Sequence, residues 1–114
     1  MTIQELIPLI EAVNKTPQAD LGREVLCGYT CDLLSWVMAH GQEGMAWVTV
    51  QTHMNVIAVA ALHDMACVIM PENIQMEKES IEKAAEEGIC VLESGLSGYE
   101  ICGRLHAAGI PDKD

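Results

Sequence analysis

The sequence contains no phenylalanine, and aromatic residues make up only 4% of its 114 positions. It is also poor in positive charge, because six lysine and arginine residues stand against 17 aspartate and glutamate residues, which gives a formal net charge of −11. Proteins that bind the phosphates of nucleic acids carry a basic surface, so this balance argues against a nucleic-acid partner. It also disfavours binding to an anionic membrane surface.

Several motifs of enzymes and metalloproteins are absent as well. No G-x-x-x-x-G-K-[ST] sequence is present, as a nucleotide-hydrolysing P-loop would require, and no G-x-G-x-x-G follows an expected strand. The five cysteines include no C-x-x-C pair, and an odd number excludes a complete disulfide framework. We therefore expect a chain that is not an enzyme and that holds no cofactor and no metal.

No apolar run approaches transmembrane length, and Met1 leads into polar residues without the basic region of a signal peptide. These features predict a cytoplasmic protein, in which the cysteines stay reduced.

The most informative stretch runs from Met45 to Met70. A strand-length apolar run at 45–51 precedes an Ala-rich apolar run at 55–63, which is too long for a typical buried strand, and a third short run follows at 66–70. This order of strand, helix and strand predicts a parallel β-α-β unit. Because the helix is apolar on every side, we expect it to pack between the sheet and another element.

Similar patterns predict the rest of the chain. Capping boxes begin helices at Thr2–Glu5 and Ser97–Glu100, and Asp32 is a good N-cap for a third helix. A surface helix is expected at 77–87, and strands are expected at 24–29 and 89–92.

Strands that alternate with helices predict the α/β class. We expect a single three-layer domain, with a mainly parallel four-stranded sheet flanked by helices. Residues 1–22 would form an N-terminal helix and its connection, residues 23–110 the α/β domain, and residues 111–114 a loose tail.

The order and spacing of several segments resemble the stand-alone proteins of the DRTGG-domain family. The segments at the start are Arg23-Glu24-Val25, Gly28-Tyr29 and Asp32-Leu33-Leu34-Ser35, those in the middle are Gln51-Thr52-His53 and Asn55-Val56, and those at the end are 81–92, Gly103-Arg104-Leu105 and Gly109-Ile110. The resemblance covers residues 23–110. The five letters Asp-Arg-Thr-Gly-Gly themselves do not occur in the sequence.

This resemblance implies a fold similar to the N-terminal domain of HPr kinase/phosphorylase, without the P-loop kinase domain. It also implies a non-catalytic regulatory module, since related domains lie beside CBS domains in regulated pyrophosphatases. By the same resemblance we expect an adenine nucleotide as ligand and pairing into a homodimer. Stand-alone members occur in anaerobic bacteria near genes for iron-only hydrogenase or related redox proteins, which implies a redox protein as the alternative partner.

The candidate ligand site lies at the carboxyl ends of the strands. In open parallel sheets ligands bind outside these ends, and the helix N-termini found there favour an anion such as phosphate. The candidate ligand-binding residues are Thr30, Asp32, Thr52, His53, Asn55, Ser94 and Ser97. The alternative interpretation is that Asp32, Thr52 and Ser97 only cap helices.

Three further hypotheses stay open from the sequence. Cys31 and His53 would meet at one sheet edge, as a nucleophile and its base or as metal ligands. A ligand-free adaptor for a redox protein would need only a contact surface. Trp47, seven methionines and the all-apolar central helix are explained equally well by a homodimer interface and by ordinary core packing. The resemblance to DRTGG domains, which often pair, favours the homodimer.

Overall fold

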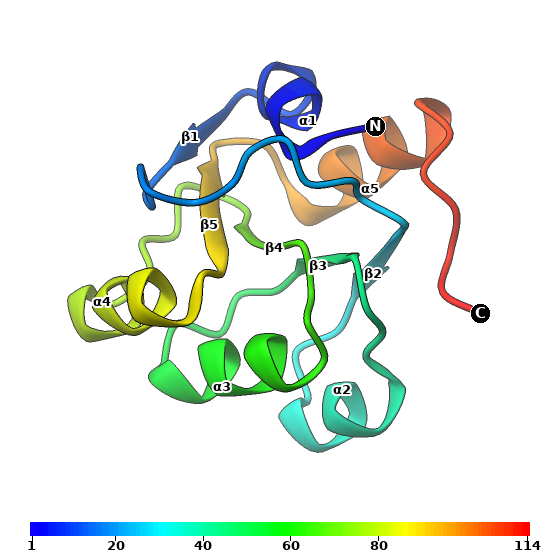
Figure 1. The fold of residues 1–114 in the computed structure, drawn as a ribbon. Helices are drawn as coiled ribbons and strands as arrows, with labels where there is room; N and C mark the ends of the chain where they lie inside the picture. Colours follow the sequence, from blue (N-terminus) through cyan, green and yellow to red (C-terminus); the bar gives the residue numbers. More distant parts are fainter.

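A five-stranded sheet runs through the middle of the molecule in the computed structural model, which describes residues 1–114 (Figure 1). In chain order the elements are α1 (Ile3–Leu9), β1 (Ala12–Asn14), β2 (Cys27–Thr30), α2 (Leu34–His40), β3 (Met45–Val48), α3 (Met54–Leu62), β4 (Cys67–Met70), α4 (Lys78–Glu87), β5 (Cys90–Ser94) and α5 (Gly98–Ala107). The strand order is β1-β5-β4-β3-β2. The four strands β2 to β5 are parallel, and β1 is antiparallel to β5.

The predicted α/β class is confirmed, whereas the prediction of four strands was one too few. The missed strand, β1, has only three residues, which is too short for an alternating pattern to be recognised. It follows Glu11, whose φ of 54° reverses the chain after α1. Residues 1–22 therefore belong to the same sheet and core as the rest of the chain.

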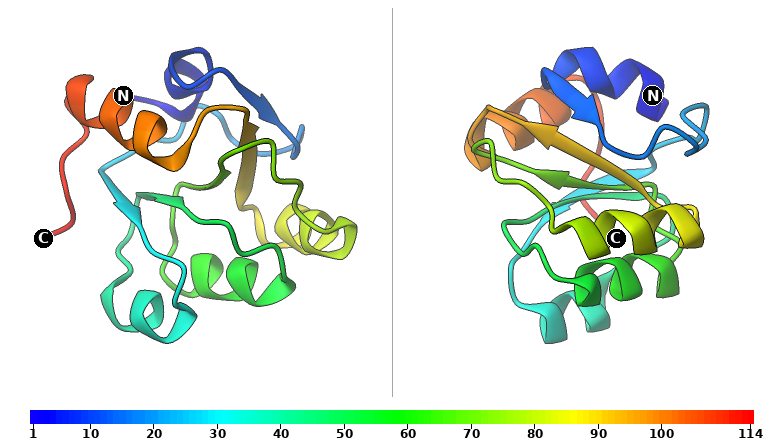
Figure 2. Two further views of the ribbon diagram at one scale, coloured as in Figure 1. Left: turned by 180° about the vertical axis from the view of Figure 1, so that it is seen from behind. Right: turned by 90° about the vertical axis from the view of Figure 1, so that its left-hand side faces the viewer.

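Helices cover both faces of the sheet (Figure 2). The three connections between parallel strands place α2, α3 and α4 on one face, whereas α1 and α5 cover the other. Alternate residues of each strand point to opposite faces, so Trp47 packs towards α3 and Val48 towards α5. All four residues of β3 and of β4 are buried for this reason.

The central helix α3 packs between α2 and α4 and against the sheet, as its apolar composition predicted. Trp47, however, is fully buried, and its indole N–H donates to the carbonyl of Cys31 at 2.9 Å. Of the two explanations for Trp47, ordinary core packing is therefore the correct one. The exposed tryptophan is Trp36, on α2, which stacks on His40.

The helix caps are confirmed at two of the three predicted positions. The Thr2–Glu5 box forms in full, and the Ser97 hydroxyl accepts from the amide of Glu100. The third prediction was wrong. The N-cap of α2 is Leu33 instead of Asp32, and no side chain caps this helix.

The C-terminal segment 111–114, predicted to be a loose tail, lies against the edge of the sheet and is attached there by a few hydrogen bonds. The carbonyl of Pro111 accepts from the Gly28 amide at 2.8 Å, so the segment pairs with β2 at one residue. The amide of Asp114 donates to the side chain of Gln42 at 3.1 Å. No helix is long and apolar enough to cross a bilayer.

Candidate functional site

The predicted ligand residues spread along the whole carboxyl edge of the parallel strands. The strand order places Thr30 and Asp32 at the end of β2, whereas Ser94 and Ser97 follow β5. These ends are three strand spacings apart, which is about 14 Å. A single mononucleotide therefore does not contact all seven predicted residues.

The topology offers the expected crevice at one end of this edge only. A binding crevice opens where neighbouring parallel strands send their connections to opposite faces of the sheet. The helices that follow β2, β3 and β4 all lie on one face, whereas α5, which follows β5, lies on the other, so the change of face falls between β4 and β5. None of the three main hollows of the surface is lined by the predicted residues, with the exception of Thr30.

Asp32 ties together the loops that follow β2 and β3. One carboxylate oxygen accepts from the Thr49 hydroxyl at 2.7 Å and from the Val50 amide at 2.9 Å. The Gln51 side chain donates to the Asp32 carbonyl at 3.0 Å. Thr49 is only 1% exposed, so this carboxylate satisfies a buried hydroxyl.

Thr52 makes the next connection along the edge. Its hydroxyl donates to the carboxylate of Glu77 at 3.0 Å, and its carbonyl accepts from the Ser80 hydroxyl at 2.7 Å. The loop after β3 is thereby attached to the N-terminus of α4. His53 and Asn55 are exposed at the start of α3 and make no side-chain hydrogen bond.

The two serines after β5 have structural partners. Ser94 is 2% exposed, and its hydroxyl donates to the carbonyl of Ile10 at 2.6 Å and accepts from the amide of Leu96. Ser97 caps α5. Of the seven candidates, Thr30, His53 and Asn55 therefore have the side chains most available to a ligand.

Cys31 and His53 form no hydrogen bond with each other. The Cys31 thiol is half-buried and contacts the carbonyl of Leu33 at 3.9 Å, whereas His53 is exposed. No group of three or more histidine, cysteine, aspartate or glutamate side chains has the geometry to hold a metal ion.

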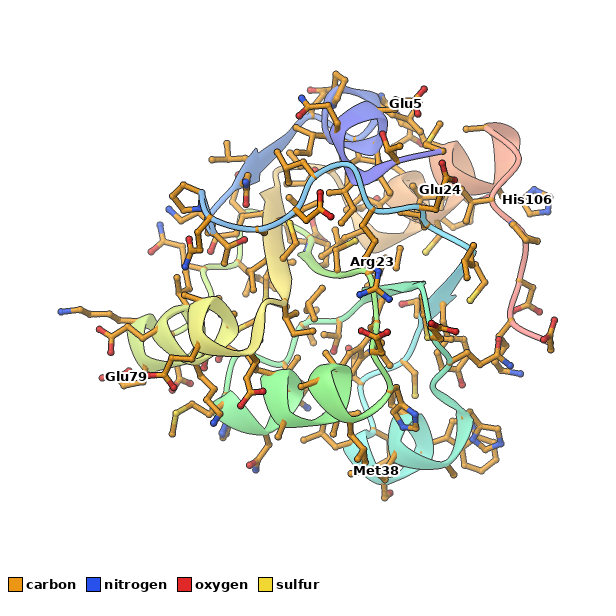
Figure 3. All side chains as sticks on the ribbon, in the orientation of Figure 1. Glu5, Arg23, Glu24, Met38, Glu79 and His106 are labelled. Atoms are coloured by element: carbon orange, nitrogen blue, oxygen red, sulfur yellow. The ribbon has the colours of Figure 1, made fainter.

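An open cavity of about 300 Å³ lies beside β2, on the face covered by α5. Apolar side chains form its wall and a few polar groups its rim. The lining residues are Gly28, Tyr29, Thr30, Cys102, Leu105, His106, Ile110, Pro111 and Asp112. Figure 3 places His106 at the outer side of this region, beside the C-terminal segment. Apart from Thr30, the sequence did not predict these residues.

Cys102 and Thr30 both line this cavity. Burial raises the pKa of the Cys102 thiol above its ordinary value, while a hydrogen bond with the Thr30 side chain acts in the opposite direction. Both Cys102 and Cys31 are half-buried free thiols, whereas the other three cysteines are buried. One partly accessible thiol thus lies at the cavity and another beside the carboxyl edge.

Comparison with solved structures identifies the fold. The structure is similar to the CBS and DRTGG domains of the regulatory region of Clostridium perfringens pyrophosphatase, solved in complex with the activator diadenosine tetraphosphate. The TM-score is 0.76 at 15% sequence identity, and the match covers 96% of this chain and 47% of that chain. This chain thus spans about half the length of the solved chain, and the likeness supports a DRTGG-like fold.

No protein-family model matches the sequence, and no curated protein matches it either. The solved neighbour is a regulatory region, and the similarity to it is a similarity of fold.

Proposed function

We propose that this domain is a non-catalytic regulatory domain that senses an adenine nucleotide. The observation that carries the proposal is the match over 96% of the chain to a regulatory region whose activator contains adenosine. The absence of a P-loop sequence agrees with a binding function rather than with nucleotide hydrolysis. Its cytoplasmic location is part of the same proposal.

The ligand site is proposed at the carboxyl end of β2. Thr30 is the one predicted residue that also lines a cavity, and it is an exposed residue. His53 and Asn55 mark the alternative site, because they offer free polar groups at the start of α3, on the face of the sheet opposite to this cavity. The remaining predicted residues, Asp32, Thr52, Ser94 and Ser97, position the loops of this edge through the hydrogen bonds described above.

Regulation would follow from a shift of population between two arrangements of the domain. A ligand changes such an equilibrium only by the difference between its affinities for the two arrangements. A partner protein then recognises the arrangement that the ligand favours.

Thermal unfolding against a panel of ligands tests this function. The panel contains AMP, ADP, ATP, diadenosine polyphosphates, sulfate and Zn²⁺. A ligand at about one hundred times its dissociation constant adds about 2.7 kcal/mol to the free energy of unfolding. At about 4 °C per kcal/mol for a domain of this size, the midpoint rises by about 10 °C. If no adenine compound raises the midpoint, the proposed function is wrong.

A ligand-free adaptor is the second candidate, and the surface of α2 favours it. Leu33, Trp36 and Met38 are 61%, 52% and 45% exposed. Val50, in the loop after β3, and Met54, the first residue of α3, are 45% and 50% exposed. Figure 3 labels Met38 at the surface of this helical layer. Exposed apolar groups of this kind favour contact with a protein, either a second copy or a redox partner.

Sedimentation of the wild-type protein and of the Trp36→Glu variant shows whether the partner of this surface is a second copy of the chain or a different protein. A homodimer through α2 gives a wild-type dimer that Trp36→Glu converts to a monomer. A wild-type monomer at high concentration eliminates the homodimer and leaves only a different protein as the partner.

A further inference from the structure

The cavity beside β2 has a composition that selects among ligands. Leu105 and Ile110 give it apolar walls, and Thr30 lies at one end. Small-molecule sites in proteins are mostly apolar with a few polar groups that fix orientation, and they occupy about 300–1,000 Å³. A cavity of about 300 Å³ lies at the small end of this range.

The edge of β2 adds backbone groups to this wall. β2 is the last strand of the sheet, and the Gly28 amide points outward to the carbonyl of Pro111. Amides two residues apart on a strand point the same way, so the Thr30 amide faces the same outer edge. The cavity thus combines apolar side chains with an outward-facing backbone donor and a hydroxyl at its end. Planar heterocycles that carry nitrogen acceptors match this combination.

The charges around the cavity disfavour an anion inside it. Asp112 is the only lining residue with a full charge at neutral pH, and it is negative. No arginine or lysine lines the cavity, and Arg104 on the same helix is paired with Glu11 and Glu100. An acidic rim repels phosphate groups, so these would stay in solvent.

The C-terminal segment forms one side of the cavity and is only lightly attached. Pro111 and Asp112 line this cavity and also a second hollow, on the other side of the segment. Beyond Ile110, which is 5% exposed, the contacts are the hydrogen bond from Gly28, the pair with Gln42, and Lys113 at 5.5 Å from the Tyr29 ring. Segments with few buried contacts change position at low free-energy cost.

We infer that this cavity binds the uncharged heterocyclic part of the ligand, a nucleobase or nucleoside, and that the C-terminal segment changes position when the cavity is filled. The inference rests on the proposed function, because it places the sensed compound in the cavity and identifies the C-terminal segment as the part that moves. Adenosine is then sufficient for binding, and ATP gains nothing from its phosphates.

Alkylation of the free thiols distinguishes this cavity from the carboxyl edge. Wild-type protein is treated with iodoacetamide with and without saturating adenosine, and the modification of each cysteine is followed by peptide mass spectrometry. Adenosine is expected to slow alkylation of Cys102, at the cavity, and to leave Cys31 unchanged. Protection of Cys31 with no change at Cys102 would overturn the inference while the sensing function stands.

Two substitutions at one position provide the matched control. Cys102→Leu fills part of the cavity, whereas Cys102→Ser keeps its volume, so only the first is expected to weaken adenosine binding, by about tenfold or more. Gly28→Ala is the second blocking variant, because a Cβ there lies 3.5 Å from Ile110 and 4.0 Å from Leu105, an ordinary contact that the fold tolerates. Unchanged adenosine affinity in both blocking variants would contradict the placement of the ligand in this cavity, while the proposed sensing function would stand.

Calorimetric titrations of adenosine and ATP complete the test. Equal or tighter binding of adenosine is expected, and ATP binding more than about tenfold tighter would show that the phosphates are recognised, against the inference. If neither compound binds the wild-type protein, the inference and the proposed adenine ligand are both wrong.

Discussion

Replacing Asp32 with alanine tests whether this residue is structural or ligand-binding. Its carboxylate accepts hydrogen bonds from the Thr49 hydroxyl and the Val50 amide, at 2.7 and 2.9 Å. Loss of a hydrogen bond that leaves a buried group unpaired costs about 1–3 kcal/mol. Thr49 is 1% exposed, so its hydroxyl cannot form a hydrogen bond with water instead. The Val50 amide lies at an exposed position and can be hydrated.

We therefore expect Asp32→Ala to lower the free energy of unfolding by about 2 kcal/mol, with Thr49 as the main cause. This corresponds to a fall of about 8 °C in the midpoint of thermal unfolding. Asp32→Asn keeps an acceptor oxygen, so we expect a smaller loss, of about 1 kcal/mol or less. Urea denaturation without ligand measures both values, with an unchanged slope against urea concentration.

Asn55→Ala is the matched control, because Asn55 is an exposed candidate whose side chain makes no hydrogen bond. It should change stability by less than about 0.5 kcal/mol. A double-mutant cycle of Asp32→Ala with Thr49→Val should give a coupling energy of about 1 kcal/mol. If Asp32→Ala unfolds at the same urea concentration as Asn55→Ala, the carboxylate does not hold the loops together and the structural reading of Asp32 is refuted.

Four further predictions concern the scaffold. Ser94→Ala removes the bond to the carbonyl of Ile10 and should lower the free energy of unfolding in urea by about 1–3 kcal/mol. Gly44→Ala should lower it by about 2 kcal/mol, because φ is 73° and a Cβ would lie 2.6 Å from Leu26. Gly103→Ala, in open space on α5, should instead raise it by up to about 1 kcal/mol. Above about pH 9 Cys67 alone should contribute a fall in stability of about 1.4 kcal/mol per pH unit, because burial raises the pKa of its thiol and only the unfolded state releases that proton.

Each of these predictions has an outcome that contradicts it. Stability of Ser94→Ala equal to wild type would mean that Ile10 finds another donor. A neutral Gly44→Ala would show that the turn tolerates a side chain. A pH dependence that persists unchanged in Cys67→Ala would assign the alkaline loss to other groups.

Local signals in the sequence predicted the fold well. The apolar runs around β3, α3 and β4 and the caps at Thr2 and Ser97 depend on neighbouring residues only, so their spacing was sufficient. β1 was missed because it consists of three residues and its pairing partner, β5, lies about eighty positions away in the chain. A three-residue strand is stabilised by the sheet that it joins rather than by its own pattern.

The candidate site was less predictable, because its residues meet only in the folded chain. The sequence predicts Asp32 to be a helix cap, but its side chain binds the hydroxyl of Thr49, which directly follows β3. The cavity brings Thr30 together with Cys102 and Pro111, which are more than seventy positions away. The point along the edge where the connections change face, between β4 and β5, could not be read from the sequence either, since the face taken by each connection is a property of the assembled sheet.

An NMR titration of the ¹⁵N-labelled protein with adenosine, recorded as amide correlation spectra, tests the central claim most directly. The account predicts that resonances of Thr30, Cys102 and residues 110–114 shift together with one dissociation constant, while those of His53 and Asn55 stay in place. Shifts confined to His53, Asn55 and the neighbouring loops would move the site to the carboxyl edge. A spectrum that adenosine and diadenosine tetraphosphate leave unchanged would contradict the sensing function itself.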